Sequence, residues 1–186
     1  EAFDVRPEVK EQVESLGGKF LKIDIGETGQ TKDGYAKELT DEQKAKQQEA
    51  QRDAIADSDI VITTAQLFGR KPPVLITKDT LALMKPGSVV VDMAATSGGN
   101  VEGSVAGETV EVNGVKVIGN GNWSQYVAKA ATDMYANNIY NLVDEFFDDE
   151  TKTFGLNLED DILAGCVITH DGNITNDMLN NAYKGA

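Results

Sequence analysis

Two short apolar runs separated by helix signals constrain the fold of this 186-residue chain more than any other feature. The runs Asp59–Thr64 and Ser88–Met93 have the length and the Val and Ile content of strands buried in parallel sheets. Between them, Thr77 is a suitable N-cap for a short helix over Lys78–Met84, and Pro86-Gly87 is a turn. Strands that alternate with helices predict an α/β fold, with a doubly wound, mostly parallel sheet covered on both faces.

Local signals predict the remaining elements. Asn113-Gly114 lies between two apolar runs and is a strong signal for a β-hairpin. The spacing of Thr40 and Gln43 is that of a capping box at the start of a polar surface helix. In chain order we expect a helix from Pro7 to a C-cap at Gly17-Gly18, a strand over Lys19–Asp24, a polar helix from Thr40 to Ala56, a hairpin of Thr109–Val112 with Val115–Ile118, a long helix over Ser124–Phe147 and a strand over Ile162–Thr169.

The charge balance excludes several classes of partner and site. Lys and Arg number 17 against 31 Asp and Glu, for a net charge of −14, and a phosphate backbone or an anionic membrane would repel such a chain. We therefore expect no nucleic-acid partner. The longest apolar runs fall far short of the ~20 residues of a membrane span. A single Cys166 and a single His170 exclude an internal disulfide and disfavour a zinc site, so no metal site is predicted.

The segment Asp4-Val5-Arg6 reads as the end of a strand, yet only three residues precede it. In dinucleotide-binding folds an acidic residue closes the second strand, about 20 residues after a glycine-rich phosphate loop. We expect that the first strand and that loop are missing, and that the chain is a fragment or that another segment supplies them. Asp4 is either an acceptor for both hydroxyls of an adenine ribose or a solvated loop acid. Its charge favours NAD over NADP, although Arg6 is able to accept a 2′-phosphate.

Other candidates follow the ends of predicted strands, where ligands bind in open parallel sheets. Thr63–Gln66 and Asp92–Thr96 are two such ends. Asp92 is either catalytic or a cap for neighbouring backbone groups. The loop over residues 25–38 contains several glycines and Tyr35, which either covers a bound nucleotide or packs on its own protein. The glycine-rich Ser97–Asn100 lacks the spacing of a P-loop.

Taken together and in order, these motifs resemble one family, the NAD(H)-binding first domain of the α subunit of proton-translocating nicotinamide nucleotide transhydrogenase. The resemblance covers nearly the whole chain. It rests on Asp4–Phe20, Gly34-Tyr-Ala-Lys-Glu38, Thr63-Thr-Ala65, Pro73-Val-Leu-Ile-Thr77, Met84–Ala94 with Gly98-Gly-Asn100, Tyr126–Asn141 and Val167–Asn173.

The resemblance implies a Rossmann-like fold that binds NAD(H) and passes a hydride to NADP(H) on a partner domain, coupled to proton movement through a membrane domain. It implies a homodimer, located in the cytoplasm and peripheral to the inner face of the plasma membrane. Residues 1–147 would form the nucleotide domain, and 148–186 would return to another lobe. No catalytic residue is identified, and the chain alone is expected to be inactive. The implied NAD(H) contacts are Asp4, Val5 and Arg6 on adenosine, Gly34 and Tyr35 on a mobile loop, and Ala65 and Gln66, where Gln66 replaces the usual apolar residue.

Two alternatives stay open. Alanine dehydrogenase shares the fold, but its catalytic Asp would fall at Thr96, where transhydrogenases commonly have Glu. Thr96 therefore disfavours the dehydrogenase and departs from the transhydrogenase pattern as well. The second alternative is a non-catalytic fragment that persists as a dimer, with the Thr109–Ile118 hairpin as an exchanged element.

Overall fold

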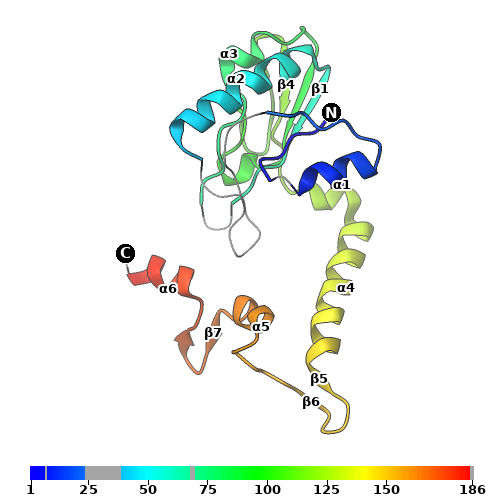
Figure 1. Cartoon of the computed structure of the whole chain (residues 1–186), viewed down its shortest axis with the longest axis vertical. Helices are drawn as coiled ribbons and strands as arrows, with labels where there is room; N and C mark the ends of the chain where they lie inside the picture. Colours follow the sequence, from blue (N-terminus) through cyan, green and yellow to red (C-terminus); the bar gives the residue numbers. More distant parts are fainter. Residues whose placement is uncertain (7, 24–38, 68–69, 185–186) are drawn as a thin grey trace. The chain divides into compact units, whose positions relative to one another are not determined.

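The computed structural model of this chain forms two compact units, Glu1–Trp123 and Ser124–Ala186 (Figure 1). The residues that the structure describes are 1–6, 8–23, 39–67 and 70–184. Within these ranges, no helix combines the length and the apolar character that a membrane crossing requires. The boundary expected near residue 148, with the tail assigned to another lobe, stays a prediction.

A four-stranded sheet forms the centre of the first unit. Its order is β1-β2-β4-β3, and β1, β2 and β4 run parallel while β3 pairs antiparallel with β4. This confirms the predicted α/β fold with a mostly parallel sheet. The strands are β1 (Ile60–Thr63), β2 (Val89–Asp92), β3 (Thr109–Val112) and β4 (Val115–Ile118).

The hairpin between β3 and β4 forms where the sequence predicts it. Asn113 and Gly114 have φ angles of 54° and 78°. Positive φ at both central residues is the requirement of a type I′ turn, whose twist matches that of the flanking strands. The turn therefore sets the register, in which Val112 lies opposite Val115.

One face of the sheet carries the core. A row of valines crosses all four strands in register, because Val61 pairs with Val90, Val90 with Val117, and Val117 with Val110. Alternation along each strand directs these side chains to the same face. The buried cluster on this face consists of Ile76, Leu81, Met84, Val90, Val101, Val115 and Val117.

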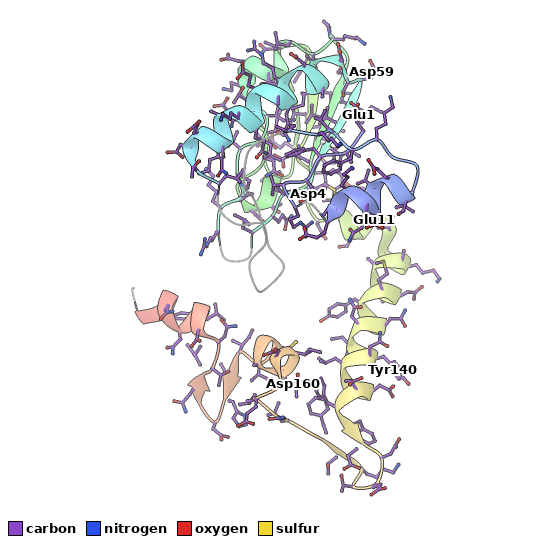
Figure 2. The ribbon with its side chains drawn as sticks, viewed as in Figure 1. Glu1, Asp4, Glu11, Asp59, Tyr140 and Asp160 are labelled. Carbon is purple, nitrogen blue, oxygen red and sulfur yellow. The ribbon has the colours of Figure 1, made fainter. Side chains whose placement is uncertain are left out.

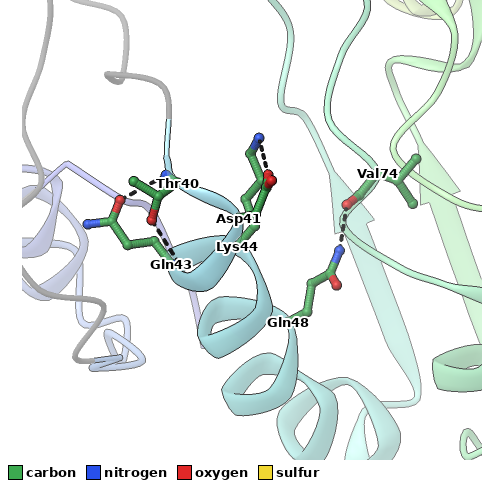
Figure 3. Close-up of polar contacts among 6 residues, drawn as sticks. All are labelled: Thr40, Asp41, Gln43, Lys44, Gln48 and Val74. Carbon is green, nitrogen blue, oxygen red and sulfur yellow. Dashed lines mark hydrogen bonds and ion pairs between the residues drawn. The ribbon is translucent and has the colours of Figure 1, made fainter.

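The helices α2 (Asp41–Asp57) and α3 (Lys78–Leu81) contact each other, and both begin at predicted caps. The Thr40 hydroxyl accepts from the Gln43 amide, and the Gln43 side chain accepts from the Thr40 amide, which confirms the capping box (Figure 3). The Gln48 side chain donates to the Val74 carbonyl at 3.3 Å and ties this polar helix to the loop before α3.

The other face of the sheet is less covered at β1. Ile60 and Ile62 are 67% and 61% exposed, whereas their neighbours Val89 and Val91 are half-buried. β1 is an edge strand of the hydrogen-bonded sheet. The sheet was predicted to be covered on both faces, and within the described residues this cover is incomplete at β1.

The N-terminal segment contains the helix α1 (Val9–Ser15). Leu16 is its C-cap, and Gly17 follows with a φ of 78°, so the helix ends one residue before the predicted glycine pair. The strand predicted over Lys19–Asp24 is reduced, in its described residues, to a single parallel bridge between Ala2 and Phe20. The segment paired with it bends at Val5 and Arg6, soon after Ala2. This bend prevents a ladder of more than one bridge.

The second unit contains one long helix, α4 (Ala128–Phe146), followed by several short elements. A 3-10 turn over Trp123–Val127 precedes the helix. α4 confirms the long helix that the sequence predicts. The remaining elements are β5 (Phe147–Asp148), β6 (Thr153–Phe154), α5 (Asp161–Cys166), β7 (Thr169–His170), β8 (Asn173–Ile174) and α6 (Asp177–Lys184).

The strand predicted over Ile162–Thr169 is wrong, because most of this segment is the helix α5. Asp160 is its N-cap, and its carboxylate accepts from the amides of Ile162 and Leu163 at 2.9 and 3.1 Å. The apolar run is too short for its periodicity to separate strand from helix, and the cap decides the conformation.

Candidate functional site

The carboxyl ends of β1, β2 and β4 point to one edge of the sheet, because the three strands are parallel. The chain leaves these strands at Thr63, Asp92 and Ile118. Ligands of open α/β sheets bind outside this edge. The loops that follow the three strands therefore form the candidate site, and we refer to them as the carboxyl edge.

Asp92 organises the loop that follows β2. Its fully buried carboxylate accepts from the amides of Ala94, Asn100 and Val101 at 3.0 to 3.2 Å. A buried carboxylate is stable only when hydrogen bonds replace its lost hydration. Asp92 therefore caps neighbouring backbone groups. Of the two roles considered for it, catalysis and capping, these hydrogen bonds support capping.

Asn100 is the residue at this edge that sequence reasoning missed. Its side chain is fully buried, and Nδ2 donates to the Ala65 carbonyl at 2.9 Å and to the Pro73 carbonyl at 2.8 Å. The backbone carbonyl of Asn100 accepts from the backbone amides of Leu75 and Ile76. The only signal in the sequence was the polar residue that ends Gly98-Gly99-Asn100.

The two glycines before Asn100 are required by the loop. Gly98 and Gly99 have φ angles of 117° and 78°, a region that side chains disfavour. A Cβ at Gly99 would lie 2.8 Å from the Asp92 carboxylate, and one at Gly98 would lie 2.9 Å from the Lys71 side chain. The loop thus closes tightly on Asp92, which small residues alone permit.

The structure brings Ala65 and Gln66, two predicted contacts, to this edge. The Ala65 carbonyl is the acceptor for Asn100, and the exposed Gln66 side chain donates to the Met93 carbonyl at 3.2 Å. The Met93 amide in turn donates to the Thr63 carbonyl at 3.0 Å. The loops after β1 and β2 are thus joined by hydrogen bonds, and the side chain of Gln66 is one of the links.

The loop after β4 also packs closely against this edge. A Cβ on Gly121 would overlap the Thr96 side chain, and one on Gly119 would lie 2.5 Å from the Val105 carbonyl. Thr96 lies in the 3-10 turn Ala95–Ser97, directly after β2. These close approaches at Gly119 and Gly121 were not predicted, because they depend on segments that the fold alone brings together.

Asp4 and Arg6 form an ion pair in the N-terminal segment. Asp4 accepts from the Arg6 backbone amide at 2.8 Å, from Nε at 3.0 Å and from Nη2 at 3.0 Å. Val5, between them, is half-buried. Burial opposes ionisation of Asp4, but the hydrogen bonds and charge of Arg6 outweigh it and hold the pKa of Asp4 below its ordinary value. The pKa of Arg6 is raised, chiefly by the same hydrogen bonds.

Asp4 lies toward the carboxyl edge in Figure 2. Asp59 immediately precedes β1 and is labelled at one end of the sheet, whereas Asp4 is labelled toward the other end. Gly34 and Tyr35, the other predicted contacts, lie outside the described residues.

Across the described ranges, no group of three or more His, Cys, Asp or Glu side chains is arranged to hold a metal ion.

Comparison with known proteins matches the chain to one family along nearly its whole length. The sequence model described as alanine dehydrogenase/PNT, C-terminal domain, matches residues 1–177. The chain is 43% identical over 180 residues to an NAD(P) transhydrogenase subunit alpha protein of Rhodospirillum rubrum, an alignment that covers 96% of this chain and 47% of that protein. The chain therefore spans about half the length of this curated relative.

Two solved structures share the fold. A transhydrogenase from Sinorhizobium meliloti superposes with a TM-score of 0.70 at 40% identity, covering 93% of this chain and 44% of the other. An L-alanine dehydrogenase superposes with a TM-score of 0.64 at 23% identity, covering 98% of this chain and 45% of the other. The second likeness, at this identity, shows the fold alone.

Proposed function

This chain belongs to the alanine dehydrogenase/PNT C-terminal domain family, and on that premise we propose that it is the NAD(H)-binding component of a proton-translocating transhydrogenase. In this role it presents NAD(H) for hydride exchange with NADP(H) held on a partner domain. The observation that carries the proposal is the 43% identity, over 96% of the chain, to a protein named as an NAD(P) transhydrogenase subunit alpha.

The geometry at Asp4 fits the adenosine end of NAD(H). The carboxylate of Asp4 accepts three hydrogen bonds from Arg6, and the backbone of Val5 adds another. In this proposal the ribose hydroxyls take the place of some of these donors. The negative charge of Asp4 and its hold on the guanidinium of Arg6 oppose a 2′-phosphate, which favours NAD(H) over NADP(H). We assign Asp4 to the ribose, and Val5 and Arg6 to the adenosine surroundings.

The backbone of Ala65 and Gln66 provides the second proposed contact. The Gln66 side chain already donates to Met93, and the Ala65 carbonyl already accepts from Asn100. We assign the remaining backbone groups of Ala65 and Gln66 to contacts with the nucleotide. Gly34 and Tyr35 are assigned by the resemblance to the loop that closes over it.

The chain's task in this proposal is binding and positioning. NAD(H) supplies the hydride chemistry when bound. Asp4 and the Ala65–Gln66 backbone fix the orientation of the nucleotide. A fixed orientation lowers the entropic part of the barrier to hydride transfer between the two reactants. No side chain of this chain is assigned a covalent or proton-transfer role.

The partners are proposed on the same premise. They are an N-terminal segment that completes the nucleotide site, a second copy in a homodimer, an NADP(H)-binding domain and a membrane domain that couples hydride transfer to proton translocation. Through these partners the chain would sit on the cytoplasmic face of the plasma membrane. The chain alone is expected to be inactive in hydride transfer.

Alanine dehydrogenase activity is the second candidate, since the fold of an L-alanine dehydrogenase is shared. Thr96 argues against it. This residue stands where the resemblance places the catalytic Asp of alanine dehydrogenase, and a threonine hydroxyl is uncharged at neutral pH and cannot replace a carboxylate as a general base. Reduction of NAD⁺ by L-alanine would favour this candidate, and reduction of an NAD analogue by NADPH would favour transhydrogenase.

The test is titration of the full-length protein with NADH and with NADPH. Asp4→Ala removes charge-assisted hydrogen bonds, so we expect about a tenfold or greater loss of NADH affinity, together with a smaller loss or a gain for NADPH. Asp59→Ala removes an exposed carboxylate at the opposite end of the sheet and serves as the matched control. Unchanged NADH affinity in Asp4→Ala would contradict the assignment.

A further inference from the structure

We propose that Asn100 is a positioning residue of the carboxyl edge, which holds the Ala65–Gln66 backbone at the place where it contacts the nucleotide. This inference rests on the proposed function and deepens it. Asn100 does not itself touch the nucleotide in this proposal. It acts through Ala65, whose carbonyl accepts from the Asn100 amide at 2.9 Å.

The geometry places Asn100 at the junction of segments that are distant in sequence. Ala65 and Pro73, which its side chain joins, are 35 and 27 residues away. Its backbone amide donates to both oxygens of Asp92, at 3.1 and 3.0 Å. Through Asp92 the position of Asn100 is fixed to the end of β2. Movement of Asn100 would therefore move the Ala65 loop relative to the sheet.

Only an amide satisfies this position. Both Nδ2 hydrogens face carbonyl oxygens, of Ala65 and Pro73, so a carboxylate of the same shape would meet acceptors on both sides. A leucine would leave both carbonyls without their side-chain donor. Asp92, 3.0 Å from the Asn100 backbone amide, would add repulsion to any negative charge introduced here.

The arrangement also carries a cost that simple packing would avoid. The Asn100 side-chain oxygen is buried without a hydrogen-bond partner among the described residues. A buried unsatisfied acceptor lowers stability, and a small apolar residue would not carry this penalty. What the amide provides in return is the pair of Nδ2 hydrogen bonds to Ala65 and Pro73, which an apolar residue cannot make.

A second contact depends on the same geometry. Gln66, the residue after Ala65, donates to the Met93 carbonyl at 3.2 Å, and the Met93 amide donates to Thr63 at 3.0 Å. The bond from Gln66 joins the same two loops that Asn100 joins, and the Met93 amide lies beside it at the end of the β1–β2 ladder. The amide of Met93 is therefore a local reporter of the junction that requires no bound nucleotide.

The experiment compares Asn100→Asp and Asn100→Ala with Asn137→Asp in the full-length protein. Asn137 is exposed on α4 in the other unit, so this control adds the same charge at an exposed helix position. NADH affinity is measured between about pH 5.5 and pH 8, at temperatures where each variant is fully folded. We expect about a tenfold loss for Asn100→Ala at all pH values, and a larger loss for Asn100→Asp near pH 8.

Acidification supplies the readout that separates positioning from stability alone. A protonated Asp at position 100 donates one hydrogen bond to Ala65 or Pro73, so we expect the affinity of Asn100→Asp to recover by about threefold or more toward pH 5.5. Asp92 and Lys71 also lie near this loop. Both are present in wild type as well, so each affinity is compared with that of wild type at the same pH.

Hydrogen exchange tests the junction without nucleotide. We expect the Met93 amide to exchange faster in Asn100→Ala, while the Lys116 amide, which donates to Ser88 at the other end of the sheet, stays unchanged. Affinity losses that follow unfolding alone, or no recovery with acid, would overturn the proposal. If wild type fails to bind NADH, the proposed function fails, and exchange at Met93 still decides whether Asn100 holds the junction.

Discussion

The two units of this chain are stabilised in different ways. Glu1–Trp123 contains a buried cluster of seven apolar side chains on one face of its sheet. In Ser124–Ala186, as far as the structure describes it, Leu163, at 2% exposed, is the one apolar side chain as deeply buried as that cluster. Hydrophobic burial is the dominant favourable contribution to folding. Within the described residues, the first unit has a hydrophobic core of this kind and the second does not.

The second unit is instead defined by local contacts. Lys129 pairs with Asp133 one turn along α4, and the Tyr140 hydroxyl, on the same helix in Figure 2, donates to Asp144. The rings of Phe146 and Phe154 meet edge to face across the start of the β5-β6 hairpin. Such contacts specify helices and turns, but each contributes only a few tenths of a kcal/mol to about 1 kcal/mol. Secondary structure can thus be well determined where little surface is buried.

The largest expected effect tests the difference in burial. Leu81→Ala removes a fully buried side chain from the core cluster, and we expect a loss of about 3 kcal/mol in the free energy of unfolding. Met134→Ala on α4 is the matched change at a side chain that is 69% exposed, and we expect a loss below about 0.5 kcal/mol. Urea denaturation followed by circular dichroism measures both.

This pair would also break the comparison. Equal losses for Leu81→Ala and Met134→Ala would mean that the exposed face of α4 is buried in the protein in solution. Dilution then tests whether association between molecules buries this face, because stability that depends on association decreases as the protein concentration is lowered.

A glycine pair tests the two units at the level of the backbone. Gly99→Ala places a Cβ against the Asp92 carboxylate at a φ of 78°, and we expect it to cost about 2 kcal/mol. Gly165 lies inside α5, and a Cβ added there would meet no atom within 4 Å, so Gly165→Ala should raise stability by about 0.5 kcal/mol or leave it unchanged. Thermal unfolding of the two variants gives the comparison, and a destabilising Gly165→Ala would contradict the open surroundings of α5.

Sequence reasoning succeeded where a few adjacent residues decide the structure. The Asn113-Gly114 turn and the Thr40 capping box are local, and both form as predicted. It failed at Ile162–Thr169, where the apolar content suggested a strand but the Asp160 cap begins a helix. The cap was present in the sequence, and it was the better signal for so short a segment.

The candidate site was only partly predictable for a related reason. Parallel strands bring their carboxyl ends together, so the location of the site followed from the fold class. Asn100 did not, because its partners Ala65, Pro73 and Asp92 lie 35, 27 and 8 residues away and no local pattern links them. The assignment of Asp4 to a nucleotide stays a prediction, and its pairing with Arg6 was not foreseen.

The smallest expected effect concerns two carboxylates, one in each unit. Hydrogen bonds from the amides of Thr151 and Glu150 lower the pKa of Asp148, which is exposed, and those from Arg6 lower the pKa of Asp4 against the opposing effect of burial. In both cases the folded pKa lies below the ordinary value of 3.8. The charged form is favoured by folding, so the stabilisation is fully present above that value and is lost as the pH falls through the folded pKa.

Titration of the two carboxyl carbons by NMR therefore distinguishes the units. Both midpoints should lie below 3.8. In 1 M salt the midpoint of Asp4 should rise toward 3.8, because part of its shift comes from the charge of Arg6, which salt screens. The midpoint of Asp148 should move less, because neutral backbone amides account for its shift. A larger salt effect on Asp148 than on Asp4 would show that the local turn Asp148–Thr151 does not hold its carboxylate in solution, and would remove one of the local contacts on which the second unit depends.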